Sequence, residues 1–215
     1  VDFDPGPGIF NLNLVKSNIF ILKLDNLGNY VWAKAIGGTE GSQCYSMAVD
    51  HVGSGDLYLT GYFYGTVDFD PSLAAFNLTS AELRDIFISK FNSSGNLIWA
   101  KTMRGNADDY GLSIAVDQLG GMVYTTGSFR GTTDFDPNGG IFNLTSPGLY
   151  DNIFISKLDS SGNFVWAKSI GGIYGDRGNS IALGTRGNSN FYITGFFSEE
   201  VDFDPGLGIF NLTSE

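Results

Sequence analysis

Four pairs of aspartates are the residues of this sequence best suited to bind a metal. Each pair stands in an Asp-Phe-Asp-Pro segment, with its carboxylates two residues apart. Ca²⁺ takes about six to eight oxygen ligands, and such a pair with nearby carbonyls and an Asn oxygen supplies part of that set. The segments lack the third acidic ligand and the terminal Glu of a calcium loop, so the alternative is that Asp begins the turn before Pro. The candidate Ca²⁺ ligands are Asp2, Asp4, Asp68, Asp70, Asp134, Asp136, Asp202 and Asp204.

Four asparagines satisfy the acceptor pattern for N-glycosylation. Three of them stand in an Asn-Leu-Thr segment that recurs with the aspartate pairs, so one ancestral segment explains all three. The first copy of this segment reads Asn11-Leu12-Asn13 and breaks the pattern. The candidate glycosylation sites are Asn77, Asn92, Asn143 and Asn211.

The sequence offers little for catalysis. Its only histidine, His51, falls in a predicted turn, and there is no Gly-x-Ser-x-Gly elbow, phosphate-binding Gly-rich loop or His-Glu-x-x-His pair. The acidic pairs recur in every repeat, whereas the two carboxylates of a glycosidase sit asymmetrically in one cleft. We expect Asp108-Asp109 and Asp176-Arg177 to be solvated in loops. The sequence therefore predicts a non-enzyme with no catalytic residues and no cofactor other than Ca²⁺.

Composition narrows the class of protein. The 215 residues are 42% hydrophobic, 14% aromatic and only 16% charged, which is typical of a folded domain. A net charge of −11 argues against a nucleic-acid partner, because such partners are bound by clustered Lys and Arg. The apolar runs have the length of strands, so no membrane insertion is expected in this section. Cys44 is the single cysteine, which excludes an intrachain disulfide.

The chain is a tandem repeat. The Asp-Phe-Asp-Pro segments begin at Asp2, Asp68, Asp134 and Asp202, at spacings of 66, 66 and 68 residues. A repeat cannot bury its apolar face alone and must stack on its neighbours. We therefore divide the chain, as one array, into repeats 1–66, 67–132 and 133–200 and a partial repeat 201–215.

Each repeat predicts four short strands and no helix, because apolar residues alternate with polar ones between clusters of Gly, Asn, Asp and Ser. In the second repeat the expected strands are 86–91, 97–101, 113–117 and 122–129. The first two form a hairpin around 92–96, where a Gly-Asn pair supplies the backbone conformation of a tight turn.

Two further patterns favour a β-propeller. The innermost strand of a propeller blade crowds the central axis and favours small residues, which suits 46–49, 113–116 and 180–183. Three tryptophans recur at a spacing of 67 residues on the predicted fourth, outermost strand, where a large ring fills the gap between blades. The alternative is a platform for stacking carbohydrate. The three recurring tryptophans are Trp32, Trp99 and Trp166.

The segments 85–101, 110–117 and 123–127 resemble the bacterial SBBP repeat, named for a seven-bladed β-propeller. The resemblance covers all three repeats. It implies propeller blades in a prokaryotic secreted or surface protein, and it carries no common catalytic residues. This chain differs from the shorter family repeat by one insertion, the Asp-Phe-Asp-Pro segment.

We expect this insertion to form a hairpin arm. In 131–146, apolar and polar residues alternate on both sides of a Pro/Gly turn, so the simplest model is a β-hairpin that prolongs the second and third strands of its blade. Asp134 and Asp136 would lie on its polar face. The expected apolar face carries Phe135, Phe142 and Leu144.

The predicted fold is all-β, with about three propeller-type blades of four antiparallel strands, a terminal partial repeat and an arm on each. Propellers usually have about four to eight blades, so the expected partners are further copies of the chain or flanking blades of a longer one. The expected function is a non-enzymatic structural or adhesive module, outside the cell or on its surface, that acts by self-assembly or within a longer surface protein or filament. The alternative is a propeller that recognises glycans or Ca²⁺ at repeated sites.

Overall fold

The computed structural model describes residues 1–12, 19–38, 40–184 and 190–214. These residues form 18 strands and contain no helix, and every strand pairing is antiparallel. No helix in the described ranges is long and apolar enough to cross a membrane. The predicted all-β, antiparallel class is confirmed.

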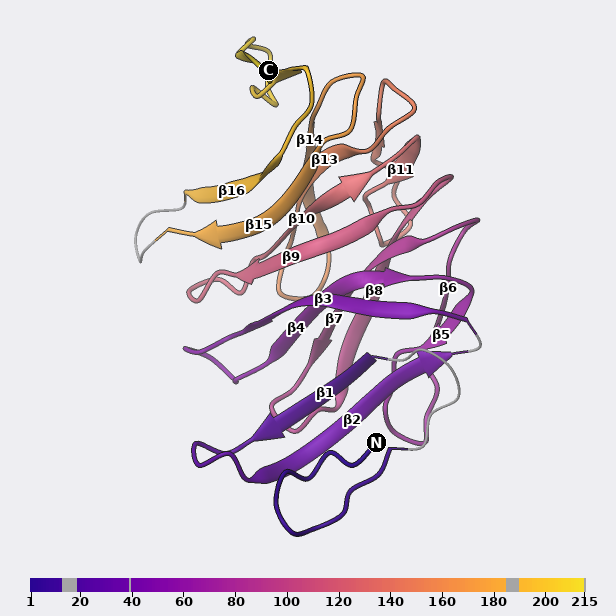
Figure 1. Cartoon of the computed structure of the whole chain (residues 1–215), viewed down its shortest axis with the longest axis vertical. Coiled ribbons are helices and arrows are strands. Elements are labelled where there is room, and N and C mark those ends of the chain that lie inside the picture. The colour runs from indigo at the N-terminus through magenta and orange to yellow at the C-terminus, as the bar shows by residue number, and fades with distance from the viewer. Residues whose placement is uncertain (13–18, 39, 185–189, 215) are drawn as a thin grey trace.

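The strands form three sheets and two separate pairs, which follow one another along the length of the molecule (Figure 1). The N-terminal sheet has the order β1 (Ile19–Leu24), β2 (Tyr30–Gly38), β5 (Thr66–Asp68), β6 (Asn77–Thr79). The central sheet has the order β12 (Asn143–Thr145), β11 (Thr132–Asp134), β8 (Leu97–Gly105), β7 (Asp85–Phe91), β4 (Leu57–Phe63), β3 (Ser42–Val49). The third sheet has the order β14 (Phe164–Ile170), β13 (Asn152–Leu158), β10 (Val123–Phe129), β9 (Tyr110–Val116). The two pairs are β15 (Arg177–Leu183) with β16 (Phe191–Phe196), and β17 (Glu200–Asp202) with β18 (Asn211–Thr213).

The core strands of the central sheet and of the third sheet each come from two repeats. The four strands predicted for the second repeat are present as β7, β8, β9 and β10. Of these, β7 and β8 complete the central sheet, whereas β9 and β10 begin the third. The described core strands therefore form two complete four-strand sets, β3-β4-β7-β8 and β9-β10-β13-β14, with two core strands, β1-β2 and β15-β16, at each end.

The small-residue strands lie next to one another, each on the inner edge of its sheet. β3, β9 and β15 are in contact in that order. The Ser46 hydroxyl accepts a hydrogen bond from the Ile114 N–H at 3.3 Å, and the Ser113 hydroxyl accepts one from the Ile181 N–H at 3.1 Å. Serine is small enough to allow this approach and polar enough to join one inner strand to the next.

The tryptophans fill the space between successive sheets. Trp99 is 9% exposed, and its indole N–H donates to the Ser160 carbonyl of the third sheet at 3.2 Å. The turn glycine Gly162 lies on the Trp99 ring, and Gly95 lies in the same way on Trp32, so closely that a Cβ at Gly95 would be 3.0 Å from that ring. These contacts support the interpretation of the tryptophans as core residues.

Three of the predicted arms form two-stranded hairpins, β5-β6, β11-β12 and β17-β18, but they do not prolong the second and third strands of their own sheet. Gly65 and Gly131, with φ of 71° and 70°, turn the chain out of the second strand. The hairpin then pairs with the fourth strand of the preceding sheet, β5 with β2 and β11 with β8. The expected attachment was wrong because β8 runs beyond its pairing with β7 and presents Gly105 to the arm, while Gly37 and Gly38 at the end of β2 pair with β5. At Gly38, a Cβ would lie 2.1 Å from the Thr66 carbonyl oxygen.

The phenylalanine between the two aspartates anchors each arm to its own sheet. Phe135 is fully buried, with its ring centroid 5.5 Å from that of Phe129 and 5.1 Å from that of Phe154. Of the other two residues on the expected apolar face, Leu144 packs against this core, whereas Phe142 stays partly exposed beside Phe164. Each of these arms therefore joins two sheets, by backbone pairing to one and by an aromatic ring to the other.

Replacing the anchoring ring is expected to destabilise the array. Phe135→Ala should lower the free energy of unfolding by about 3–5 kcal/mol, because it removes a fully buried ring and leaves a cavity. Ile141→Ala, in the same arm but 80% exposed, is the matched control and should change it by less than about 0.5 kcal/mol. Urea denaturation followed by tryptophan fluorescence measures both, and equal effects would contradict the anchoring role.

Candidate functional site

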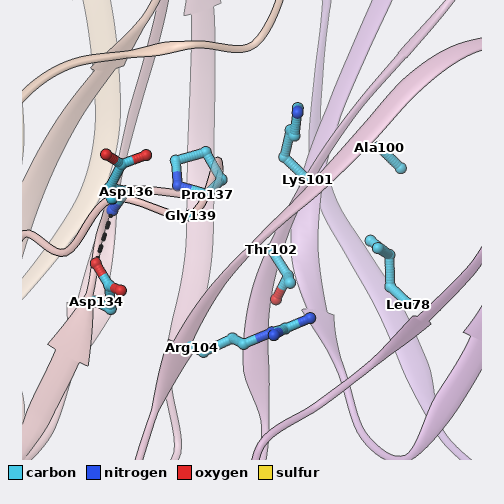
Figure 2. Close-up of a pocket in the computed structure, with 10 residues that line it drawn as sticks. Leu78, Ala100, Lys101, Thr102, Arg104, Asp134, Asp136, Pro137 and Gly139 are labelled. Carbon is cyan, nitrogen blue, oxygen red and sulfur yellow. Dashed lines mark hydrogen bonds between the residues drawn. The ribbon is translucent and has the colours of Figure 1, made fainter.

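A hollow lined by charged and apolar side chains lies between two successive arms (Figure 2). It has a volume of about 230 Å³. Leu78 of β6 lines one side, the segment 100–104 of β8 forms the floor, and the arm that follows β11 supplies the other side. We call this hollow the arm groove. The side chains of chemical interest in it are Lys101, Arg104, Asp134 and Asp136.

The arm groove brings opposite charges to one place. Lys101 and Arg104 come from the outer strand β8, while Asp134 and Asp136 come from the arm (Figure 2). The Lys101 ammonium donates a hydrogen bond to the side-chain oxygen of Asn138, which ties the arm to β8. Such a groove offers both donors and acceptors to a polar ligand, and the two cations raise the electrostatic cost of holding Ca²⁺ there.

Within each arm, the two aspartates are held in a turn. One oxygen of Asp134 accepts from the Asp136 N–H at 3.0 Å and from the Phe142 N–H at 2.8 Å, and Asp136 accepts from the Asn138 N–H at 3.0 Å. The other oxygen of Asp136 lies against Gly140, where a Cβ would be 2.1 Å away. The same bonds recur at Asp2, Asp4, Asp68, Asp70, Asp202 and Asp204.

These bonds favour the ionised carboxylate. The N–H groups of Phe10 and Asp4 lower the pKa of Asp2, and those of Phe210 and Asp204 lower the pKa of Asp202. The geometry is that of the turn-initiating alternative. The structure brings together the two members of each pair, but no three acidic, His or Cys side chains form a metal-binding group in the ranges it describes. Ca²⁺ binding stays a prediction.

The expectation that Asp109 and Asp176 are solvated is wrong, because both carboxylates are fully buried. Asp109 accepts from the Thr133 hydroxyl at 2.8 Å and the Arg130 N–H at 3.1 Å, and Asp176 occupies the same position one repeat later. Burial raises the pKa of Asp109 to about 8 and also raises that of Asp176. Both residues tie the base of an arm to the start of an inner strand, a contact that local sequence cannot reveal. Their recurrence 67 residues apart is the signal that distinguishes them from ordinary loop acids.

Asp108, the neighbour of Asp109, is partly exposed and forms an ion pair with Arg84 at 3.0 Å.

The candidate glycosylation sites on the arms also have defined places. Asn77, Asn143 and Asn211 are exposed on β6, β12 and β18. Glycosylation of these asparagines stays a prediction.

Asn92 differs from the arm asparagines because its side chain shapes a turn. Its oxygen accepts from the N–H groups of Ser94 and Asn96, both at 3.0 Å. Asp25 and Asp159 make the equivalent bonds in the neighbouring repeats. An aspartate serves equally well in this position, so the Asn at 92 needs no glycan to explain it.

The lone histidine and the lone cysteine are also placed. His51 is exposed in a turn, as expected, and its backbone N–H donates to Gln118 at 2.6 Å. Cys44 is partly buried in β3, and burial raises the pKa of its thiol to about 11, so the thiol is protonated at neutral pH.

Known proteins offer distant similarity. No family model matches the chain. It is 26% identical over 197 residues, 78% of this chain, to an uncharacterized WD repeat-containing protein, L264, of Acanthamoeba polyphaga mimivirus. It is 31% identical over 129 residues, 58% of this chain, to the regulatory protein FlaEY of Caulobacter vibrioides. The matches span 13% of the length of each of these proteins. The chain is thus similar to part of a repeat-containing protein.

The aspartate pairs can be tested as turn formers. Asp134→Ala removes the acceptor of two N–H groups and should lower the free energy of unfolding by about 1–2 kcal/mol, whereas Asp134→Asn keeps an acceptor and should cost less. Thermal unfolding with and without added Ca²⁺ measures this. A rise in melting temperature with Ca²⁺, lost in both variants, would instead show that Asp134 is a ligand.

The buried carboxylate predicts a pH dependence. Asp109 has a pKa of about 8 in the folded chain and about 3.9 when unfolded, so the folded state binds more protons between these values. Stability should therefore fall as pH rises from about 4 to about 8, by at most about 1.4 kcal/mol per pH unit from this group. Asp109→Asn should flatten the slope, and Asp108→Asn should not. Urea denaturation at pH 5 and pH 8 measures it, and parallel slopes for wild type and Asp109→Asn would contradict it.

Proposed function

We propose that this chain is a non-enzymatic structural or adhesive module, made of propeller-type blades of the SBBP kind, that acts outside the cell or on its surface. It works through self-assembly or as a section of a longer surface protein or filament. The observation that carries this proposal is the repeated joining of neighbouring sheets by the arms, in which β5 pairs with β2 and β11 pairs with β8.

Three features support blades as the repeating unit. Each complete set has four antiparallel strands in the order inner, second, third and outer. Three inner strands contact one another in succession, as the strands nearest a propeller axis do. The similar mimivirus protein is named for WD repeats, which are four-stranded propeller blades.

The arms suit a load-bearing role. Backbone hydrogen bonds to one sheet and a buried ring in the next give each boundary two attachments besides the contacts of the inner strands. Stability in repeat arrays comes from such nearest-neighbour interfaces. Because the chain matches only 13% of the length of its relatives, a place within a longer protein is part of the proposal.

The arm groove favours a second candidate from another class, a propeller that binds glycans at equivalent sites. Sugars present many hydroxyl groups, and the groove offers the donors Lys101 and Arg104 beside the acceptors Asp134 and Asp136. Ca²⁺ is the other ligand in this class, with the aspartate pairs as its donors. Neither candidate function includes a nucleic-acid partner.

A glycan array combined with negative-stain electron microscopy separates the two candidates. If the chain has the structural role, we expect it to bind no glycan. We also expect it to form filaments or rings, or to be part of a longer protein chain. Glycan binding that is lost in Arg104→Ala and in Asp134→Ala/Asp136→Ala would overturn it in favour of the second candidate. Glu82→Gln, an exposed residue outside the groove, is the matched control and should leave any binding unchanged.

A further inference from the structure

Two core strands lack, among the described residues, a strand partner that their equivalents in the complete sheets have. β1 pairs with β2 alone, and β16 pairs with β15 alone. In the complete sheets, the equivalents of β16 are β4 and β10, and they pair with β7 and β13, the equivalents of β1. The third strand β1, toward one end of the molecule, and the second strand β16, toward the other, are therefore each paired on one side only (Figure 1).

Both free edges expose side chains that are buried in the complete sheets. Phe20 of β1 is 58% exposed, whereas its equivalents Phe87 and Phe154, one and two repeats later, are fully buried. Tyr192 of β16 is 63% exposed, whereas its equivalent Tyr124 is 6% exposed. The two edges are thus the separated halves of an interface that the complete sheets already contain.

A hollow marks the place of the absent strands. It has a volume of about 590 Å³ and lies between residues 19–22 of β1 and residues 41–47, chiefly of β3. Between the equivalent strands β7 and β9, the same region is occupied by β4, which contacts both. A strand with the sequence and position of β4 therefore fits this hollow. Of the two later equivalents of β4, β10 already pairs with β13, whereas β16 has no third-strand partner among the described residues.

We propose that the chain docks head to tail on a second copy, with β16 of one copy pairing antiparallel with β1 of the next. The four strands β15 and β16 of one copy and β1 and β2 of the next then form one complete set. This partner rests on the self-assembly that the proposed function includes. Carried over from the β10–β13 pairing, the register joins Phe191 to Leu24, Tyr192 to Lys23, Thr194 to Ile21 and Phe196 to Ile19.

The register reproduces a cation–aromatic contact. Lys90 lies 5.1 Å from the ring centroid of Tyr58, and Lys157 lies 5.0 Å from that of Tyr124. Docking places Lys23 of one copy over Tyr192 of its neighbour in the same way. A cation over an aromatic ring is attracted by its face, so this pair adds specificity to the apolar contact.

The docked arrangement sets two arms in competition. In the central sheet one arm ring, Phe69, contacts rings of both neighbouring strands. At each free edge the arm ring contacts only one such ring. The Phe3 and Phe20 ring centroids are 5.2 Å apart, and those of Phe203 and Phe197 are 5.1 Å apart. Only one of the two arm rings fits between Phe197 of one copy and Phe20 of the next.

The N-terminal arm is the one that gives way. The C-terminal arm is also bound to the third sheet through the bridge between Gly171 and Asp202, as the internal arms are bound to their preceding sheets. The described contacts of the N-terminal arm are with its own sheet, through Phe3 and through Phe10 on Tyr30. It therefore contacts β1 at Phe20 in the single molecule and moves aside on docking.

Cys44 provides a probe of the register. Its equivalents, Gly111 and Gly178, lie so close to the preceding sheet that a Cβ would be 2.2 Å from the Thr60 hydroxyl and 2.4 Å from the Thr126 hydroxyl. This chain has Cys44 where both internal boundaries have glycine, so docked copies must separate slightly at this position, and Cys44 then lies beside Thr194 of the neighbour. Thr194→Cys should therefore form a disulfide with Cys44 of the next copy under oxidising conditions.

The experiment is oxidation of the Thr194→Cys chain with oxidised glutathione, followed by non-reducing electrophoresis and peptide mapping. A ladder of covalent oligomers, joined between positions 44 and 194, supports the proposal. Thr145→Cys, exposed on β12, is the matched control. Failure of Thr194→Cys to form the 44–194 bond, or equal cross-linking in the control, overturns the proposal.

Two variants test the edges without a cross-link. Tyr192→Asp should lower the weight-average mass measured by light scattering toward that of the 23.2 kDa chain, and Phe3→Ala should raise it by freeing β1. An unchanged mass in both variants overturns the docking. Because the proposed function also includes a section of a longer protein, a strictly monomeric chain overturns this register while leaving that function to its own test.

Discussion

Backbone pairing between each arm and the outer strand of the preceding sheet is the constraint on which the array depends. β11 continues the central sheet, although the chain has by then passed through β9 and β10 of the third sheet. The arm ring Phe135 returns to that third sheet. Each boundary is thus held from both sides, and neighbouring repeats share one core.

This constraint accounts for residues that otherwise have no evident purpose. Gly38 and Gly105 leave room on the outer strand for the arm. Asp134 holds the arm turn through two N–H groups, and the buried Asp109 holds its base through Thr133. The arm groove follows from the same arrangement, because successive arms stand apart over one outer strand.

The two ends of the array carry aromatic residues at the same repeat positions as its internal boundaries. Positions that are buried at each internal boundary become exposed at β1 and β16, where a strand partner is missing among the described residues. A structural role and head-to-tail docking are therefore related proposals, because both extend the interface between repeats beyond one molecule. The similarity to part of a WD repeat-containing protein fits a chain whose unit of construction is the repeat.

The sequence alone determined the repeat period, the strands, the turns and the arm hairpins, because alternation of apolar residues and turn-forming residues act over a few neighbouring positions. The predicted strands 86–91 and 97–101 are β7 and β8, and their turn contains Gly95 in the expected conformation, with φ of 77°. Only the tertiary structure decided which sheet receives each arm, that Asp109 is buried and that Phe20 is exposed while Phe87 is not. Those outcomes depend on which distant strands become neighbours, and three similar repeats carry the same local pattern whether or not a neighbour is present.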